Sequence, residues 1–138
     1  MNLERLITSI KNHEGYRARS YKDTEGYDTI GYGFAVKNLV LQQDISHHIL
    51  ERKVSELIVD CFNSFPWLAK SPAKAQEVVI EMCYQMGVSG VSKFVKAIAH
   101  LKRGNWEEAA EEMLDSRWAR QTPNRANELS GIIKGIKT

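Results

Sequence analysis

The sequence predicts an α+β fold in which a small antiparallel sheet near the N-terminus is followed by a larger helical bundle. Tyrosines, a threonine and an isoleucine, interrupted by glycines, form a strand-like stretch between Arg19 and Phe34. After it, apolar residues recur at helical spacing in segments separated by proline and glycine. No repeat or low-complexity linker divides the 138 residues, so we expect a single domain built of two lobes.

A short amphipathic helix is expected over residues 1–13. Its apolar face is formed by residues spaced three and four apart, namely Leu3, Leu6, Ile7 and Ile10. Asn2 stands before them in the N-cap position, because its side-chain oxygen can accept a hydrogen bond from a free backbone N–H of the first turn. The helix therefore runs into Glu14.

The sheet lobe is expected over residues 14–45. Asp23-Thr24-Glu25-Gly26 has the composition of a turn, and Gly31 and Gly33 punctuate the strand-like residues that follow it. We expect this to be the only sheet of the chain.

A helix over residues 46–66 is expected to link the two lobes. Its apolar face holds Ile49, Leu50, Val54, Leu57, Ile58 and Cys61. Pro66 marks its exit, since proline cannot continue the hydrogen-bonding pattern of a helix interior.

Residues 67–138 are expected to form the helical lobe. Ser71-Pro72 reads as an N-cap followed by proline at the first helical position, and Gly87 closes the apolar stripe that follows. The next helix should stop at Gly104, a capping-box-like start follows at Asn105, and Thr122-Pro123 should open the last helix.

The composition is that of an ordinary soluble globular protein, with 43% hydrophobic and 26% charged residues. A net charge of +2 is compatible with binding to an anionic polymer such as a bacterial wall. It is much smaller than the positive charge typical of a nucleic-acid-binding domain. Cys61 and Cys83 sit among apolar residues, so we expect buried free thiols and no disulfide. The four histidines show no metal-ligand spacing, and we expect no metal or other cofactor.

The start of the chain has no apolar run of signal-peptide length, and no segment is long and apolar enough to cross a membrane. We therefore expect a protein that is made in the cytoplasm without stable membrane insertion.

Glu14 and Asp23 suggest the chemistry. Hydrolysis of a glycosidic bond needs one carboxyl group that donates a proton to the leaving oxygen and a second that stays ionised. A helix end and a turn nine positions later could hold such a pair. Taken alone, however, Glu14 is typical of a solvated charge at a helix end, and Asp23 is typical of a residue that forms a turn.

Three blocks of sequence give these residues a context. The first block runs from Glu14 to Gly33 and has Tyr-Lys-Asp-Thr-Glu-Gly-Tyr at its centre. The second consists of Gln85 to Val91 and Trp106 to Ala110. The third runs from Ser116 to Ala126 and contains Ser-Arg-Trp and Gln-Thr-Pro-Asn-Arg-Ala. In the same order, these blocks resemble the lysozymes of the T-even bacteriophages. The resemblance covers most of the chain.

The resemblance implies a lysozyme-like fold with a cleft between two lobes, and a muramidase that cuts the β-1,4 bond between N-acetylmuramic acid and N-acetylglucosamine in peptidoglycan with inversion. It assigns Glu14 as the proton donor, Asp23 as the second carboxylate and Thr29 as the hydroxyl that places the attacking water.

The resemblance also implies roles for residues of the second lobe. Gln85, Arg117 and Asn124 would bind substrate, and Arg125 would reach and support Glu14. Trp106 and Trp118 read as core anchors rather than sugar-stacking platforms.

The chain departs from the T-even pattern at two places. Phe34 stands where the T-even enzyme carries a histidine, so a salt bridge of that family has no counterpart at this position. The stretch 35–44 is much shorter, so sugar subsites built from that region are expected to differ.

The expected setting is the cytoplasm of an infected bacterium, where a monomeric endolysin would await a membrane-permeabilising holin. Two alternatives stay open. A lytic transglycosylase uses one catalytic glutamate and forms an anhydro-sugar end, although Asp23 and Thr29 together disfavour it. A catalytically silent wall-binding or virion module would have kept the cleft without the reaction.

Overall fold

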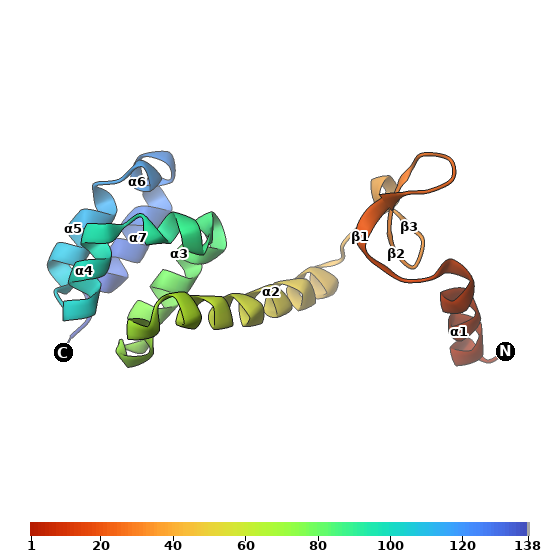
Figure 1. Cartoon of the computed structure of the whole chain (residues 1–138), viewed down its shortest axis with the longest axis horizontal. Coiled ribbons are helices and arrows are strands. Elements are labelled where there is room, and N and C mark those ends of the chain that lie inside the picture. The colour runs from red at the N-terminus through yellow and green to blue at the C-terminus, as the bar shows by residue number, and fades with distance from the viewer. Residues whose placement is uncertain (138) are drawn as a thin grey trace. The chain divides into compact units, whose positions relative to one another are not determined.

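The computed structural model describes residues 1–137, which form two compact units. The first is Met1–Ser46 and the second begins at His47 (Figure 1). Strands occur only in the first unit of the described chain, and the second consists of helices. The predicted α+β class with a small sheet followed by a helical bundle is confirmed.

The first unit starts with α1 (Leu3–Glu14). The side chain of Asn2 caps it, because Asn2 Oδ1 accepts a hydrogen bond from the Arg5 backbone N–H at 3.0 Å. Gly15, with φ of 71°, then turns the chain away from the helix axis into the first strand. The expected helix and its cap are confirmed, and Glu14 is its last residue.

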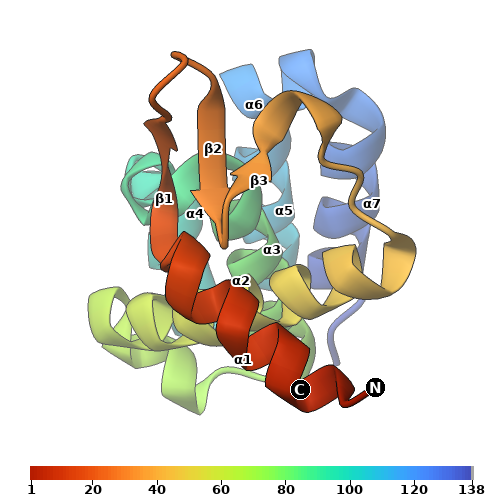
Figure 2. The ribbon, with the colours of Figure 1, turned by 90° about the vertical axis from the view of Figure 1, so that its right-hand side faces the viewer.

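The sheet contains β1 (Arg17–Lys22), β2 (Asp28–Gly31) and β3 (Phe34–Ala35), which lie side by side in that order and are antiparallel (Figure 2). In β2, Thr29 lies opposite both Tyr21 and Ala35. A 3₁₀ turn, η1 (Val36–Asn38), follows. The short region after the sheet therefore holds one helical turn and leads to α2 (Gln43–Ser64), which begins in this unit.

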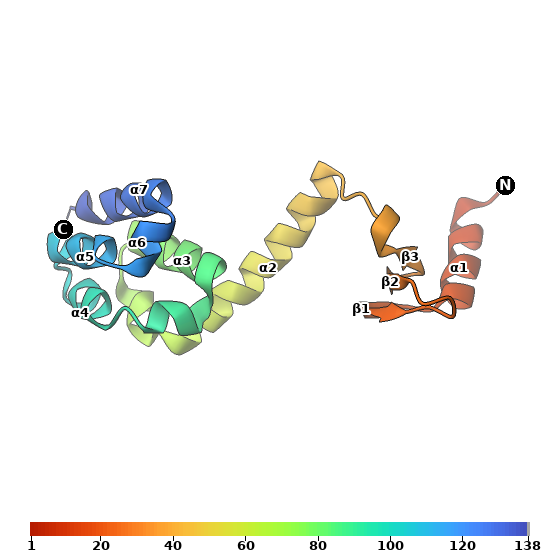
Figure 3. The ribbon, with the colours of Figure 1, turned by 90° about the horizontal axis from the view of Figure 1, so that it is seen from above.

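The second unit contains most of α2 and all elements that follow it. They are the 3₁₀ helix η2 (Pro66–Lys70), α3 (Ala73–Ser92), α4 (Val95–Arg103), α5 (Trp106–Leu114), α6 (Arg117–Gln121) and α7 (Pro123–Lys134). Helix α5 lies between α4 and α7 (Figure 3). Gly104 ends α4 in the left-handed conformation, with φ of 74°, as expected.

The hydrophobic core lies in the second unit. Its fully buried side chains include Leu68, Met113 and Ile133, contributed by η2, α5 and α7. Trp106 and Trp118 are also buried, which confirms them as core anchors. Cys61 and Cys83 are free and buried, as expected from their apolar neighbours.

Two local predictions in this unit were wrong in detail, and a third is confirmed. Ser71 does not cap α3, because its hydroxyl donates to the carbonyl oxygen of Trp67 and Pro72 occupies the cap position. Asn105 makes no capping hydrogen bond, since its amide faces the ring of His100. Gly87 closes the first helical stretch of α3 as expected, because its non-helical angles (φ 79°, ψ 160°) separate that stretch from a second one that continues to Ser92.

No helix within residues 1–137 has the length and apolar character that a membrane span requires.

Candidate active site

Glu14 is positioned by the end of α1 and by the turn between β2 and β3. A Cβ atom built on Gly33 would lie 3.0 Å from Glu14 Cδ and closer still to Oε2, so the carboxylate lies directly against the Gly33 backbone. Gly33 also has a φ of 77°, which side chains rarely tolerate. Glycine at position 33 therefore makes room for the carboxylate of Glu14, the residue predicted as the proton donor.

Asp23 is held in the turn between β1 and β2. Its Oδ1 accepts hydrogen bonds from the backbone N–H groups of Glu25 and Tyr27, at 2.9 and 2.8 Å. This is an Asx-type turn, in which the aspartate side chain replaces a backbone acceptor. The carboxylate is fixed through one oxygen, while Oδ2 has no hydrogen-bond partner within the described residues.

Thr29 is the only buried residue among positions 1–46, with 5% of its surface exposed. Its hydroxyl donates to the carbonyl oxygen of Tyr27 at 3.0 Å. The backbone N–H of Asp23 donates to the same oxygen at 2.9 Å. The backbone of Tyr27 thus joins Asp23 and Thr29, and the Thr29 oxygen keeps its lone pairs for a further donor such as water.

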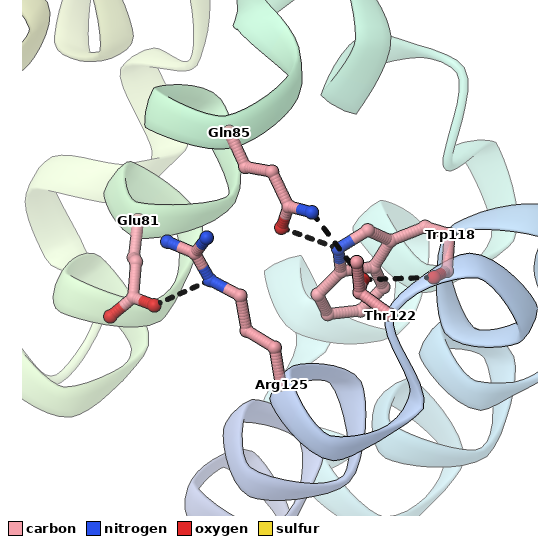
Figure 4. Close-up of polar contacts among 5 residues, drawn as sticks. All are labelled: Glu81, Gln85, Trp118, Thr122 and Arg125. Carbon is pink, nitrogen blue, oxygen red and sulfur yellow. Dashed lines mark hydrogen bonds and ion pairs between the residues drawn. The ribbon is translucent and has the colours of Figure 1, made fainter.

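Gln85, in the second unit, belongs to a hydrogen-bonded network of α3, α6 and the start of α7 (Figure 4). The indole N–H of Trp118 donates to Gln85 Oε1 at 2.8 Å, and Gln85 Nε2 donates to the hydroxyl of Thr122 at 3.3 Å. That hydroxyl donates in turn to the carbonyl oxygen of Trp118 at 3.1 Å. The amide of Gln85 therefore has a fixed orientation, with one N–H left for a ligand.

Arg125 forms an ion pair with Glu81 of α3. The distance from Arg125 Nε to Glu81 Oε2 is 2.9 Å, and the two side chains point toward each other in Figure 4. Glu81 was not among the residues predicted from the sequence. Its only sequence signal is its place one helical turn before Gln85, on the same face of α3.

A cavity of about 710 Å³ opens in the second unit beside this network. Its lining includes Gln85 and Arg117, together with Lys93, Lys96 and Glu112. Asn124, the second residue of α7, is exposed and does not line this cavity. The lining combines both signs of charge with the apolar surface of Phe94 and Trp118.

The candidate residues thus fall into two groups. Glu14, Asp23 and Thr29 belong to the first unit, whereas Gln85, Arg117, Asn124 and Arg125 belong to the second. The roles assigned to these residues, including the support of Glu14 by Arg125, stay predictions. Within residues 1–137, no group of three or more His, Cys, Asp or Glu side chains is arranged to hold a metal ion.

The second unit also holds two buried thiols, Cys61 and Cys83, which are not among the candidate residues. Burial raises the pKa of Cys83 to about 12, and a hydrogen bond between the Cys83 and Cys61 side chains adds to this increase. Burial also raises the pKa of Cys61. Because the thiolate is the nucleophilic form, neither group suits nucleophilic chemistry at neutral pH.

Known proteins match this chain across both of its units. A family model described as phage lysozyme matches residues 11–135. The chain is 30% identical to "Probable T4-type lysozyme 1" of Dictyostelium discoideum, with 94% of this chain and 95% of that protein covered. "Probable T4-type lysozyme 2" of the same organism is 29% identical, with 94% and 93% covered. The chain is also 29% identical to the pre-baseplate central spike protein Gp5 of Enterobacteria phage T4, of which the match covers 27%.

Proposed function

The chain belongs to the phage lysozyme family of peptidoglycan-hydrolysing glycosidases, and from this premise we propose that it is a muramidase cleaving the β-1,4 bond between N-acetylmuramic acid and N-acetylglucosamine. The hydrogen bonds that join Asp23 and Thr29 through the Tyr27 backbone support the assignment of these two residues to the hydrolytic reaction.

In the proposed reaction Glu14 is the general acid. It donates its proton to the glycosidic oxygen as the bond to the leaving sugar breaks. The carboxylate of Asp23 removes a proton from the attacking water, and the Thr29 hydroxyl orients that water. The free Oδ2 of Asp23 and the lone pairs of the buried Thr29 oxygen support these assignments, because both can accept a hydrogen bond from one water molecule.

We propose that the reaction inverts the anomeric configuration. Inversion requires water between the sugar and the base, and the two carboxyl groups of inverting glycosidases are about 6.5–9.5 Å apart for this reason. The α-anomer would be the first product. NMR spectroscopy of the product within the first minutes of the reaction tests this step.

Binding of the polymer is assigned to residues of the second unit. Gln85, Arg117 and Asn124 would donate hydrogen bonds to sugar hydroxyls, acetamido groups or the stem peptide. Arg125 would hold Glu14 by an ion pair. The remaining N–H of Gln85 and the position of Arg117 beside a large cavity support the first two of these roles.

The biological role proposed is lysis of a bacterial host by a monomeric enzyme that is released from the cytoplasm with the help of a holin. This setting follows from the resemblance to phage enzymes and stays a prediction.

The deciding experiment compares the wild-type protein with Glu14→Gln and Glu4→Gln on permeabilised Gram-negative cells. Glu4 is exposed on the same helix and serves as the matched control. Wild type and Glu4→Gln should clear the suspension, whereas folded Glu14→Gln should not. Equal clearing by all three proteins would remove Glu14 from the mechanism. A 1,6-anhydro-muramic product would instead identify a lytic transglycosylase.

A further inference from the structure

Glu14 lies at a point of the first unit where core packing does not hold the chain. It is the last residue of α1, and no residue of that helix is buried. Gly15 follows it, and glycine restricts the backbone less than any other residue does. Within this unit, the position of the Glu14 side chain therefore depends on a few individual contacts.

These contacts converge on the turn between β2 and β3, which consists of Tyr32 and Gly33. Lys11 Nζ lies 5.4 Å from the centroid of the Tyr32 ring, in a cation–π contact. The ring centroids of Tyr16 and Tyr32 are 5.5 Å apart, and the ring planes are tilted by 48°. A Cβ atom on Gly33 would overlap the carboxylate of Glu14. All five residues belong to the first unit.

The register of the sheet explains why the two tyrosines meet. Arg17 lies opposite Gly31 in the antiparallel pair of β1 and β2. The next residues outward are Tyr16 and Tyr32, which are therefore also opposite each other and close enough for their rings to interact. The sheet thereby places the Tyr32 ring beside the start of β1.

The spacing along α1 explains the contact with the lysine. Lys11 stands three positions before Glu14, and residues at this spacing lie on the same side of a helix. The β2–β3 turn can therefore contact both of them, with Tyr32 against Lys11 and Gly33 against Glu14.

Tyr32 thus contacts the chain on both sides of Glu14, three residues before it and two residues after it. Stability alone does not account for this arrangement. Tyr16 is 66% exposed and Lys11 is exposed, and contacts between exposed side chains contribute little to folding.

We infer that Tyr32 and Lys11 are positioning residues for the hydrolytic reaction. The Tyr32 ring fixes the last turn of α1 through Lys11 and the start of β1 through Tyr16, and so holds the carboxyl group of Glu14 against Gly33. The inference rests on the proposed function, in which Glu14 is the general acid. Such an acid must lie within hydrogen-bond reach of the glycosidic oxygen, so a small displacement of its carboxyl group lowers kcat.

The experiment measures kcat and KM on soluble peptidoglycan fragments, together with urea denaturation, for the wild type, Lys11→Met, Lys11→Arg and Lys37→Met. Methionine keeps an unbranched side chain but removes the cation, whereas arginine keeps the cation. Lys37 is the matched control, because its Nζ lies 5.3 Å from the centroid of the Tyr27 ring in the same unit. Each methionine variant therefore loses one similar cation–π contact.

Lys11→Met should lower kcat about fivefold to tenfold with KM changed less than twofold, because the last turn of α1 is no longer fixed to the Tyr32 ring. Lys11→Arg should keep kcat within about twofold of the wild type, since a guanidinium also binds the face of an aromatic ring. Lys37→Met should leave both constants unchanged while losing a comparable, small amount of stability.

Two variants of Tyr32 test the ring itself. Tyr32→Phe retains the aromatic face and should keep kcat within about twofold of the wild type. Tyr32→Leu removes that face and should lower kcat about tenfold with KM little changed. Adding Lys11→Met to Tyr32→Leu should lower kcat less than about twofold further, because both substitutions remove the same contact.

Equal kcat values for Lys11→Met and Lys37→Met would overturn the inference and leave a merely structural cation–π contact. Both lysines are exposed, so these variants decide the matter even where Tyr32→Leu does not fold. If the wild type is active and Glu14→Gln is inactive, such equality contradicts the positioning role alone. If Glu14→Gln is as active as the wild type, the proposed function and this inference fail together.

Discussion

Asp23 and Thr29 share one hydrogen-bond acceptor, the carbonyl oxygen of Tyr27. The backbone N–H of Asp23 reaches it at 2.9 Å and the hydroxyl of Thr29 at 3.0 Å. The backbone N–H of Tyr27 also donates to Asp23 Oδ1. The proposed base and the proposed water-orienting hydroxyl are therefore linked through the backbone of one residue, Tyr27.

Thr29→Val should remove activity with little loss of stability. Valine preserves the shape of the buried side chain but leaves the Tyr27 carbonyl oxygen with one hydrogen bond fewer, at a cost of about 1 kcal/mol in the free energy of unfolding. We expect kcat to fall about 100-fold, because the attacking water loses its orienting group. Turnover of peptidoglycan fragments and urea denaturation measure the two effects.

Thr29→Ser is the control, because it retains the hydroxyl. It should keep activity within about tenfold of the wild type. Full activity in Thr29→Val would exclude the hydroxyl from the mechanism.

Gly33→Ala should impair catalysis because the added methyl group would displace the carboxylate of Glu14. The substitution also strains a backbone with φ of 77°, at a cost of about 1 kcal/mol or more. A displacement of roughly 1 Å can lower kcat about 100-fold. Steady-state kinetics on folded protein, verified by circular dichroism, test this expectation.

Gly104→Ala separates backbone strain from the contact with Glu14. Gly104 ends α4 with a φ of 74°, and an added Cβ would make only ordinary contacts, at 3.6 Å or more, with the side chain of Trp106. It should lose similar stability and retain most of its activity. Equal kcat values in the two alanine variants would mean that the position of Glu14 does not depend on Gly33.

Arg117→Ala should weaken substrate binding more than it slows the reaction. Arg117 lines the large cavity of the second unit and is exposed, so loss of its contact with the polymer should raise KM about fivefold to tenfold with kcat little changed. Arg120 is exposed on the same helix α6 but does not line the cavity. An equal rise in KM for Arg120→Ala would indicate a general effect of positive charge on an anionic polymer.

Gln85→Met should destabilise the second unit, because the indole N–H of Trp118 would lose its acceptor. An unsatisfied buried donor costs about 1–2 kcal/mol in the free energy of unfolding. Gln85→Glu keeps an acceptor oxygen and should lose less. Urea denaturation of both variants tests the order, and a smaller loss for methionine than for glutamate would contradict it.

The buried thiol of Cys83 should make stability depend on alkaline pH. Below its ordinary pKa of 9.0 the thiol is protonated in both the folded and the unfolded state, so its effect is constant there. Between pH 9 and about 12 the unfolded chain releases the proton and the folded chain retains it, so the free energy of unfolding falls.

The measurement is urea denaturation at pH 8 and pH 10 for the wild type and Cys83→Ala. The wild type should lose about 1 kcal/mol more than the variant over this interval. Equal losses would mean that the Cys83 thiol ionises as readily in the folded protein as in the unfolded chain.

Elements whose signals act within a few residues were predictable. Asn2 caps α1, Gly104 ends α4 and Pro123 opens α7 at the positions expected from the chain itself. Capping, positive φ and the missing N–H of proline are properties of one residue and its near neighbours. The short helix α6 (Arg117–Gln121) has no such extended periodicity and was not predicted.

The sequence by itself determined the α+β order of elements, the positions of most helix ends and, through long matching blocks, the family and the candidate residues. Only the tertiary structure decided which atoms meet: Glu14 with the Gly33 backbone, Gln85 with Trp118, and Glu81 with Arg125. The physical reason is the range of the forces involved. Backbone propensities and apolar periodicity depend on residues that are close together in the sequence. A hydrogen bond between residues 44 positions apart forms only once α3 and α7 have packed against each other.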